Sequence, residues 1–169
     1  MGAKNYEIER KYLIAMPDAD FLAAQPGCAV WTIEQVYLNA QPGETRRVRR
    51  VIEDGEIRCY KTFKVRINAL TAEEDEGLIS QQEYETFLLE ADPEKRPILK
   101  TRYRVPYEGQ LLEFDLYPFW TDRAVLEIEL ESEDQPAMIP QWVRVIREVT
   151  EDFRYKNVSL AKEVPMDEI

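Results

Sequence analysis

Residues 6–14 read YEIERKYLI, and this stretch decides how the rest of the sequence is interpreted. Side chains of an extended strand alternate between its two faces, so Glu7, Glu9 and Lys11 point the same way. Two carboxylates and one ammonium in a row can hold a divalent cation and contact an anion that the cation also contacts. A solvated strand face can carry the same residues, so the pattern gains weight only where other strands repeat it.

The composition limits the classes of function. A chain of 169 residues is long enough for one domain with a real core, and we expect residues 1–169 to form a single domain. A formal net charge of -11 argues against broad binding of duplex nucleic acid, which needs a basic face. The chain has no His, which excludes a His-based catalytic triad and the usual zinc ligand. A metal site must then use carboxylates, which favour Mg²⁺ or Mn²⁺.

The sequence shows no signal peptide and no long apolar run. We therefore expect a soluble, cytoplasmic protein without a membrane partner. Cys28 and Cys59 are the two cysteines, and a disulfide between them stays open at this stage. Nothing in their spacing indicates a disulfide-stapled secreted fold.

Alternating and β-branched residues predict a mainly β (α+β) fold. Gln41-Pro42-Gly43, Asp54-Gly55 and Glu108-Gly109 are turn signals, and the last two are typical of tight hairpins. About eight antiparallel strands lie in the range where a sheet closes into a barrel. The predicted strands are 5–14, 29–39, 44–53, 57–66, 81–90, 98–107, 110–118 and 123–132.

Few helices are expected around this barrel. Short ones are predicted at 17–25 and 158–163, and a better one at 140–150 with Pro near its start. The acidic stretch 71–77 is predicted to be a mobile loop. The connection 66–80 is long enough to gate a tunnel mouth, but an ordinary tolerated insertion is the favoured interpretation.

Charge alternates with apolar or aromatic residues on nearly every predicted strand. An antiparallel sheet with one wet face explains any single strand well. Here both signs occur in dense blocks of Arg and Glu, and a closed barrel would turn them inward. Buried charges need partners, which a polyanion and its metal ions would supply. The alternating sets are Arg47 and Arg49; Arg58, Tyr60, Thr62 and Lys64; Glu83 and Glu85; Lys100, Arg102 and Arg104; Glu113 and Asp115; and Glu127, Glu129 and Glu131.

From about residue 5 to 163, the sequence resembles the CYTH domain of the triphosphate tunnel metalloenzyme superfamily. The ordered set of motifs carries the resemblance more than any one of them. The motifs are Glu7-x-Glu9-x-Lys11, Gln35-Val36-Tyr37-Leu38, Arg47-Val48-Arg49, Thr62-Phe63-Lys64, Glu83-Tyr84-Glu85, Lys100-Thr101-Arg102-Tyr103, Glu113-Phe114-Asp115, Glu127-Ile128-Glu129 and the stretch 155–160.

The resemblance implies an eight-stranded antiparallel tunnel that binds a triphosphate with Mg²⁺ or Mn²⁺. It implies catalytic roles for Glu7, Glu9, Lys11 and Lys64. Metal ions would be held by Glu7, Glu9, Asp115, Glu127 and Glu129. Phosphates would be held by Lys11, Arg47, Arg49, Lys64, Lys100, Arg102, Arg104 and Arg154, with Lys156 as an alternative to Arg154.

The leading functional interpretation is metal-dependent hydrolysis of a small triphosphate, foremost inorganic tripolyphosphate. Adenylyl cyclase and thiamine triphosphatase are alternatives on the same fold, and a noncatalytic polyphosphate or nucleotide sensor is an alternative of another class. Trp31, Trp120 and Trp142 suit stacking on a base or thiamine ring, although such residues are more often core or interface anchors. Apolar outer faces raise the further expectation of a homodimer.

Overall fold

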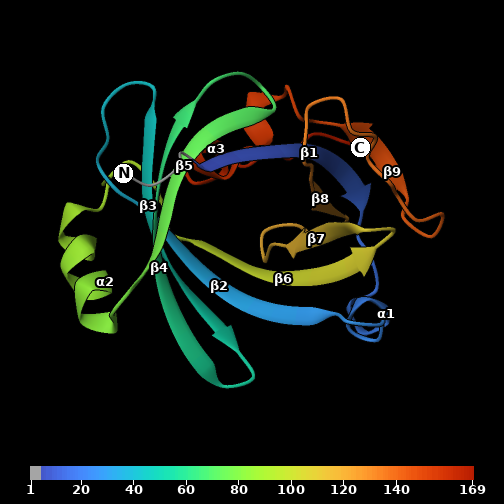
Figure 1. The fold of residues 1–169 in the computed structure, drawn as a ribbon, viewed down its shortest axis with the longest axis horizontal. Helices are drawn as coiled ribbons and strands as arrows, with labels where there is room; N and C mark the ends of the chain where they lie inside the picture. The colour runs from blue at the N-terminus through green and yellow to red at the C-terminus, as the bar shows by residue number, and fades with distance from the viewer. Residues whose placement is uncertain (1–4) are drawn as a thin grey trace.

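The structure, a computed structural model, describes residues 5–169 and shows an antiparallel barrel (Figure 1). The strands are β1 (Asn5–Ala15), β2 (Ala29–Tyr37), β3 (Glu44–Glu53), β4 (Glu56–Arg66), β5 (Thr71–Ile79), β6 (Ile98–Tyr107), β7 (Gln110–Leu116), β8 (Arg123–Glu129) and β9 (Val145–Glu148). The helices are α1 (Ala19–Ala23), α2 (Gln81–Phe87) and α3 (Asn157–Leu160), with 3-10 turns η1 (Leu88–Glu90) and η2 (Phe153–Tyr155).

Strand β1 closes the barrel because it pairs with different strands along its length. The sheet order is β5-β4-β3-β2-β6-β7-β8-β1-β9, and a further pairing joins β5 to β1. Residues 5–8 of β1 pair with β5, and residues 9–15 pair with β8. Strand β9 lies outside the ring, against residues 12–14 of β1. The predicted eight-stranded antiparallel barrel is confirmed, with one extra strand outside it.

Two tight turns fix the hairpin register. Asp54 and Gly55 have φ of 50° and 78°, and Glu108 and Gly109 have φ of 50° and 73°. Positive φ at both central residues matches the twist of the flanking strands, which explains why Gly follows an acidic residue at each turn. Both predicted hairpins, β3–β4 and β6–β7, are confirmed.

The structure corrects the assignment of residues 71–90. The predicted strand 81–90 is wrong, since it forms α2 and η1, and the predicted loop 71–77 belongs to strand β5. Helix α2 begins with a capping box in which Ser80 accepts from the Glu83 amide and Glu83 accepts from the Ser80 amide. The acidic residues of β5 disfavour a strand by composition alone, but their pairing with β4 and β1 overrides that preference.

The predicted helix 140–150 is also wrong, because residues 145–148 form strand β9. The edge of β1 beyond β5 has free backbone groups, and pairing with β9 satisfies them. The other two predicted helices are confirmed with shorter bounds, as α1 and α3.

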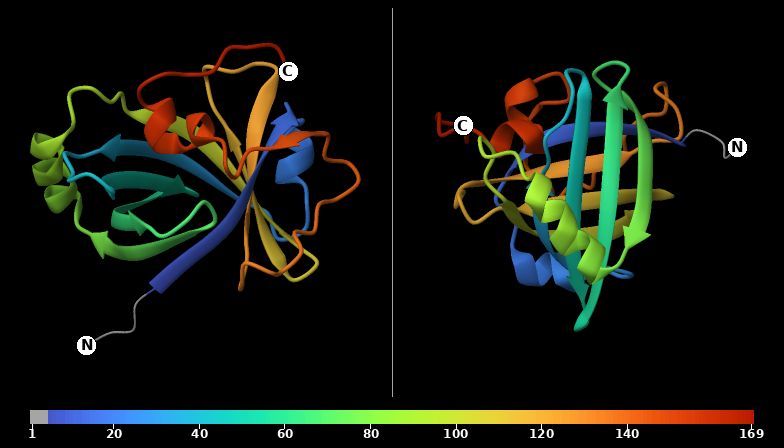
Figure 2. Two further views of the ribbon diagram at one scale, coloured as in Figure 1. Left: turned by 90° about the horizontal axis from the view of Figure 1, so that it is seen from above. Right: turned by 90° about the vertical axis from the view of Figure 1, so that its left-hand side faces the viewer.

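Apolar residues fill one end of the barrel. Leu13 and Val125 point inward and pack against Tyr155 and Leu160. We call residues 149–161 the plug, because this C-terminal segment crosses the barrel near α3 (Figure 2). The plug leaves the charged half of the interior as the part that can take a ligand.

Two further apolar clusters cover the outside. Leu22 of α1 packs with Phe114, Leu126 and Ile128 on the outer face of β7 and β8. Helix α2 lies against the outside of β3 and β4 (Figure 2, right), where Tyr84 packs on apolar residues of β2, β3 and β4. Cys28 and Cys59 are free thiols, so they form no disulfide. Among residues 5–169, no helix is both long enough and apolar enough to cross a membrane.

Replacing Ser80 by Ala tests the helical assignment of residues 81–87. Loss of this N-cap should lower the free energy of unfolding by about 1 kcal/mol. Urea unfolding with an unchanged slope measures the effect. Gln82→Ala, on the exposed side of the same helix, should stay within about 0.5 kcal/mol of the parent. Equal stability of the parent and Ser80→Ala would contradict the cap.

Candidate functional site

All eight barrel strands contribute side chains to a polar cavity of about 140 Å³, which we call the inner chamber. Its lining alternates with outward-facing residues along every strand, as the period of two requires. The lining residues are Glu7, Glu9, Trp31, Arg47, Arg49, Lys64, Glu74, Glu76, Arg102, Arg104, Glu113, Glu127 and Glu129, with Asn157 of the plug.

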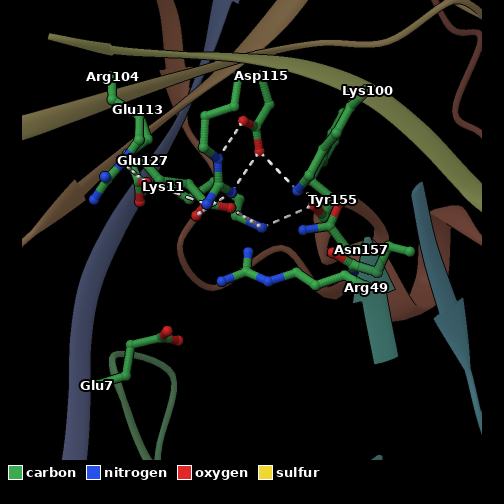
Figure 3. A network of polar contacts seen from close by, with 12 residues as sticks. Glu7, Lys11, Arg49, Lys100, Arg104, Glu113, Asp115, Glu127, Tyr155 and Asn157 are labelled. Atoms are coloured by element: carbon green, nitrogen blue, oxygen red, sulfur yellow. Dashed lines mark hydrogen bonds and ion pairs between the residues drawn. The ribbon is translucent and has the colours of Figure 1, made fainter. Parts of the chain in front are cut away.

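Asp115 organises a buried ion-pair network on one wall of the chamber (Figure 3). Its two oxygens lie 2.7 and 2.9 Å from Nε and Nη2 of Arg102, and Lys100 Nζ is 2.9 Å from Oδ2. Burial by itself would raise the pKa of Asp115, but Arg102 and Lys100 hold it below its usual value. A bidentate arginine contact of this kind is geometrically demanding, so Asp115 fixes the position of the Arg102 guanidinium without a ligand.

Glu127 extends this network to β1. Lys11 lies directly opposite it in the β1–β8 register, with Nζ 3.0 Å from Oε1 of Glu127. Nζ of Lys11 also donates to the carbonyl oxygen of Tyr155, 3.2 Å away, which ties the wall to the plug. Arg102 contacts Glu113 at 3.1 Å, so each buried acid of this wall has a basic partner.

A second acidic group lies where β1, β4 and β5 meet. Nζ of Lys64 is 2.7 Å from Glu7 and 3.5 Å from Glu74. Although burial opposes it, Lys64 lowers the pKa of Glu7 to about 2. Burial and the neighbouring Glu7 raise the pKa of Glu74 to about 7. One lysine therefore neutralises one of the two carboxylates well and the other poorly.

Glu9 and Glu129 form the least compensated pair. They lie directly opposite each other in the β1–β8 register, where like charges repel. Within residues 5–169 neither carboxylate has a cation within ion-pairing distance. Burial and Glu127 raise the pKa of Glu9 well above its usual value, and burial and Glu113 raise that of Glu129 to about 7. This pair lacks a positive charge.

The chemistry of these carboxylates fits a hard divalent cation. Glu9 and Glu129 offer oxygen ligands that no cation of the described residues uses, and Glu7 and Glu74 line the same chamber. In the described part of the chain, no three acidic or thiol groups converge closely enough to hold an ion by themselves. The donor types suit Mg²⁺ or Mn²⁺, and a bound anion would have to complete the ligand set.

Basic groups beside the plug have donors without partners. Nε of Arg47, Nε of Arg49 and Nη1 of Arg66 are buried and make no hydrogen bond with any of residues 5–169. Such groups are costly unless a ligand satisfies them. Arg47, Arg66 and Lys156 line a further cavity of about 260 Å³, the plug-side pocket, which shares Glu9 with the inner chamber. The unpartnered donors are therefore a site for an anion.

Most of the predicted site residues come together in these two cavities, but Arg154 does not. Its side chain is 56% exposed and is held by Asp152 at 2.8 Å. Lys156 is in the plug-side pocket instead, and burial with nearby Lys11 and Arg66 lowers its pKa to about 8. Lys100 and Asp115 are in the wall behind the chamber.

The sequence analysis missed Glu74 and Glu76. They repeat the Glu-x-Glu spacing on β5, where Glu76 pairs with Arg49 at 3.3 Å and accepts from Thr62 at 2.8 Å. The motif Glu83-Tyr84-Glu85, assigned to this strand from the sequence, lies on helix α2 outside the barrel. The signal in the sequence was the alternation of side chains within residues 71–79, which places Glu74 and Glu76 on the same face of a strand.

Comparison with known proteins identifies the family of this chain. The family model of the CYTH domain matches residues 5–164. The chain belongs to the CYTH family. Across 172 aligned residues it is 36% identical to a protein of Nitrosomonas europaea named inorganic triphosphatase, covering 94% of this chain and 99% of that protein.

Solved structures show the same fold as this CYTH protein. The crystal structure of the inorganic triphosphatase NE1496 has 29% identity and a TM-score of 0.55, with 98% of each chain covered. The PH1819 protein from Pyrococcus horikoshii has 20% identity and a TM-score of 0.59, covering 76% of this chain and 80% of that one. At that identity the second likeness shows the fold alone.

The raised carboxyl pKa values predict a pH dependence of stability in the metal-free protein. An unfolded Glu titrates near 4.3, so between about pH 5 and 7 the folded state binds more protons at Glu74 and Glu129 than the unfolded state does. The free energy of unfolding should therefore fall as the pH rises through this window. The chain has no His to mask the effect, and the contribution of Glu7, whose pKa is about 2, is constant there.

Urea unfolding of the metal-free protein at pH 5.5 and 7.5 measures this fall. Glu74→Gln should reduce it, because the amide does not ionise. Glu85→Gln, on the exposed side of α2, should leave it unchanged. A free energy of unfolding that rises between pH 5.5 and 7.5 would show that the pKa values of these carboxylates are not raised.

Replacing Asp115 by Asn should destabilise the protein strongly. The change leaves Lys100 and Arg102 buried without their shared counter-ion, which costs about 3–5 kcal/mol. Chemical unfolding measures the loss, with Asp75→Asn on the exposed part of β5 as the matched control. A loss no larger than that of the control would mean that the network is dispensable.

Proposed function

We propose that this CYTH protein hydrolyses inorganic tripolyphosphate with Mg²⁺ or Mn²⁺ as the metal ion. The observation that carries the proposal is the pairing of two deficits inside one barrel. Among residues 5–169, buried arginine donors lack an acceptor, and carboxylates nearby lack a cation. A polyphosphate with a divalent cation supplies both at once.

The basic groups bind the phosphates in two ways. Arg47, Arg49, Arg66 and Lys156 have free or weakly engaged donors, so they make the direct contacts. Lys11, Lys100, Arg102 and Arg104 are already paired with acids of the chamber wall, and those acids fix their positions. Lys64, between Glu7 and Glu74, lies where phosphate and metal sites meet. Arg154 would contribute only long-range charge.

Glu7, Glu9 and Glu129 would hold the metal ion from the protein side, and Asp115 and Glu127 would support the site through the basic residues that they orient. When bound, the ion would neutralise the substrate and activate a water for attack on a terminal phosphorus. Glu9, beside the ion, would also accept a proton from that water. The surrounding arginines would stabilise charge on the leaving diphosphate.

The relatives support this substrate. The protein of Nitrosomonas europaea that is 36% identical to this chain is named inorganic triphosphatase, and almost its whole length aligns. Four further statements stay predictions from the sequence: the protein is one domain, it acts in the cytoplasm, it forms a homodimer, and it has no duplex nucleic acid partner.

Phosphate release from tripolyphosphate, with Mg²⁺ or Mn²⁺ and with excess chelator, tests the function. Chelator should abolish turnover. Glu9→Gln keeps the size of the side chain and removes its charge, and it should lower kcat by about 100-fold or more. Glu85→Gln, which makes the same change on the outer helix α2, should retain the parent's rate.

Product analysis separates the alternatives. Full activity in chelator would contradict the metal dependence. Cyclic AMP from ATP would favour a cyclase, faster turnover of thiamine triphosphate would favour that substrate, and tight binding of tripolyphosphate without turnover would favour a sensor.

A further inference from the structure

Trp31 lies near the end of the barrel opposite the plug. It comes early in β2 and lines the inner chamber, and it is only half-buried, so it stands between the chamber and solvent. Its indole Nε1 donates to Glu53 at 2.9 Å, and the same carboxylate oxygen accepts from Arg58 at 2.8 Å. Glu53 and Arg58 flank the tight β3–β4 turn, which fixes their positions.

Both polar and aromatic surfaces of this indole are already in use. The guanidinium carbon of Arg104 is 4.1 Å from the ring centroid, and that of Arg58 is 5.7 Å away. Arg104 is held in turn by Glu113 at 3.1 Å. Cation–π contacts of this kind hold an aromatic ring in place. The ring is therefore engaged by the protein and is poorly placed to stack on a ligand.

We call Trp31, Glu53, Arg58 and Arg104 the collar. Each of its two arginines has a carboxylate partner, Glu53 for Arg58 and Glu113 of the chamber wall for Arg104. Within residues 5–169, Nε of Arg58 makes no hydrogen bond, as is also true of Nε of Arg47 and Nη1 of Arg66 on the plug side, so the difference between the two ends lies in the ion pairs that hold both collar arginines. The collar therefore has the character of a wall, and the plug side that of a phosphate site.

We propose that the collar closes this end of the chamber and that Trp31 determines specificity. It would admit a short, unsubstituted polyphosphate and exclude a triphosphate whose outer phosphate carries a bulky organic group, such as a nucleoside. This inference rests on the proposed function, because it concerns which triphosphates enter the same chamber. A wall held in place by its own contacts excludes a larger ligand sterically. Good contacts between the phosphates and the arginines do not remove that clash.

The test compares affinities for tripolyphosphate and ATP, measured by calorimetry with Mg²⁺, in the parent, Trp31→Ala and Trp31→Phe. Trp31→Ala opens the collar and should raise the affinity for ATP relative to tripolyphosphate by at least about tenfold. Trp31→Phe keeps a ring over Arg104 and should stay near the parent ratio. Trp142→Ala controls for general loosening, because Trp142 packs on Phe21 and Phe114 away from the chamber.

Three outcomes would overturn the proposal. The first is an unchanged ratio of ATP to tripolyphosphate affinity in folded Trp31→Ala. The second is a fall of that ratio in Trp31→Ala, which would mean that Trp31 stacks on the base. The third is a parent protein that already binds ATP as tightly as tripolyphosphate. Melting curves verify folding, and Trp31→Leu carries the same comparison if the Ala variant does not fold. Turnover of tripolyphosphate by the parent is measured separately. Binding without turnover would contradict the hydrolase while leaving the selectivity measurement valid.

Discussion

The enclosure of opposite charges inside a closed barrel is the constraint on which this structure depends. Taking a carboxylate or guanidinium out of water costs several kcal/mol, and only a well-placed partner offsets that cost. Asp115 meets this condition with Arg102 and Lys100, and Glu127 meets it with Lys11. These pairs make one wall complete without a ligand. The charges that remain uncompensated then mark the place where a ligand is needed.

Register decides which charges are compensated. Arg102 lies opposite Asp115, and Lys11 lies opposite Glu127, so neighbouring strands supply the partner. Two residues further along the β1–β8 pair, Glu9 faces Glu129, and the same register produces repulsion. The barrel cannot relieve this by sliding one residue, because every inward side chain would turn outward. Apolar packing of Leu13 and Val125 against the plug fixes the register, and so maintains the repulsion in the chamber.

The sequence predicted the closed barrel, seven of its eight strands and the charged inward face of six of them, because a period of two assigns every side chain to one face. It failed between residues 71 and 90, where a Glu-x-Glu pair occurs twice. Glu74 and Glu76 lie on β5 and line the chamber, whereas Glu83 and Glu85 lie on α2. The capping signal of Ser80 and Glu83 was present in the sequence, but strand pairing across the barrel decided between the two pairs. The pairs between acids and bases could not be predicted either, because they depend on register and on the plug.

The two deficits of the chamber are linked to each other. A cation between Glu9 and Glu129 would lower their pKa values and leave more positive charge on the phosphate side uncompensated. Burial and the neighbouring Arg47 and Arg102 lower the pKa of Arg49, so positive charge is in excess there. An anion bound to Arg47 and Arg49 would compensate that charge, and its own negative charge would strengthen the binding of a cation at Glu9 and Glu129. Because such coupling is reciprocal, metal and polyphosphate must each strengthen binding of the other by the same factor. The absence of a three-carboxylate cluster among residues 5–169 follows the same logic, since the bound anion supplies ligands that the protein withholds. If the protein carboxylates alone bound the metal tightly, metal affinity would not depend on the phosphate. The arginines would then not contribute to metal binding through the anion that they hold.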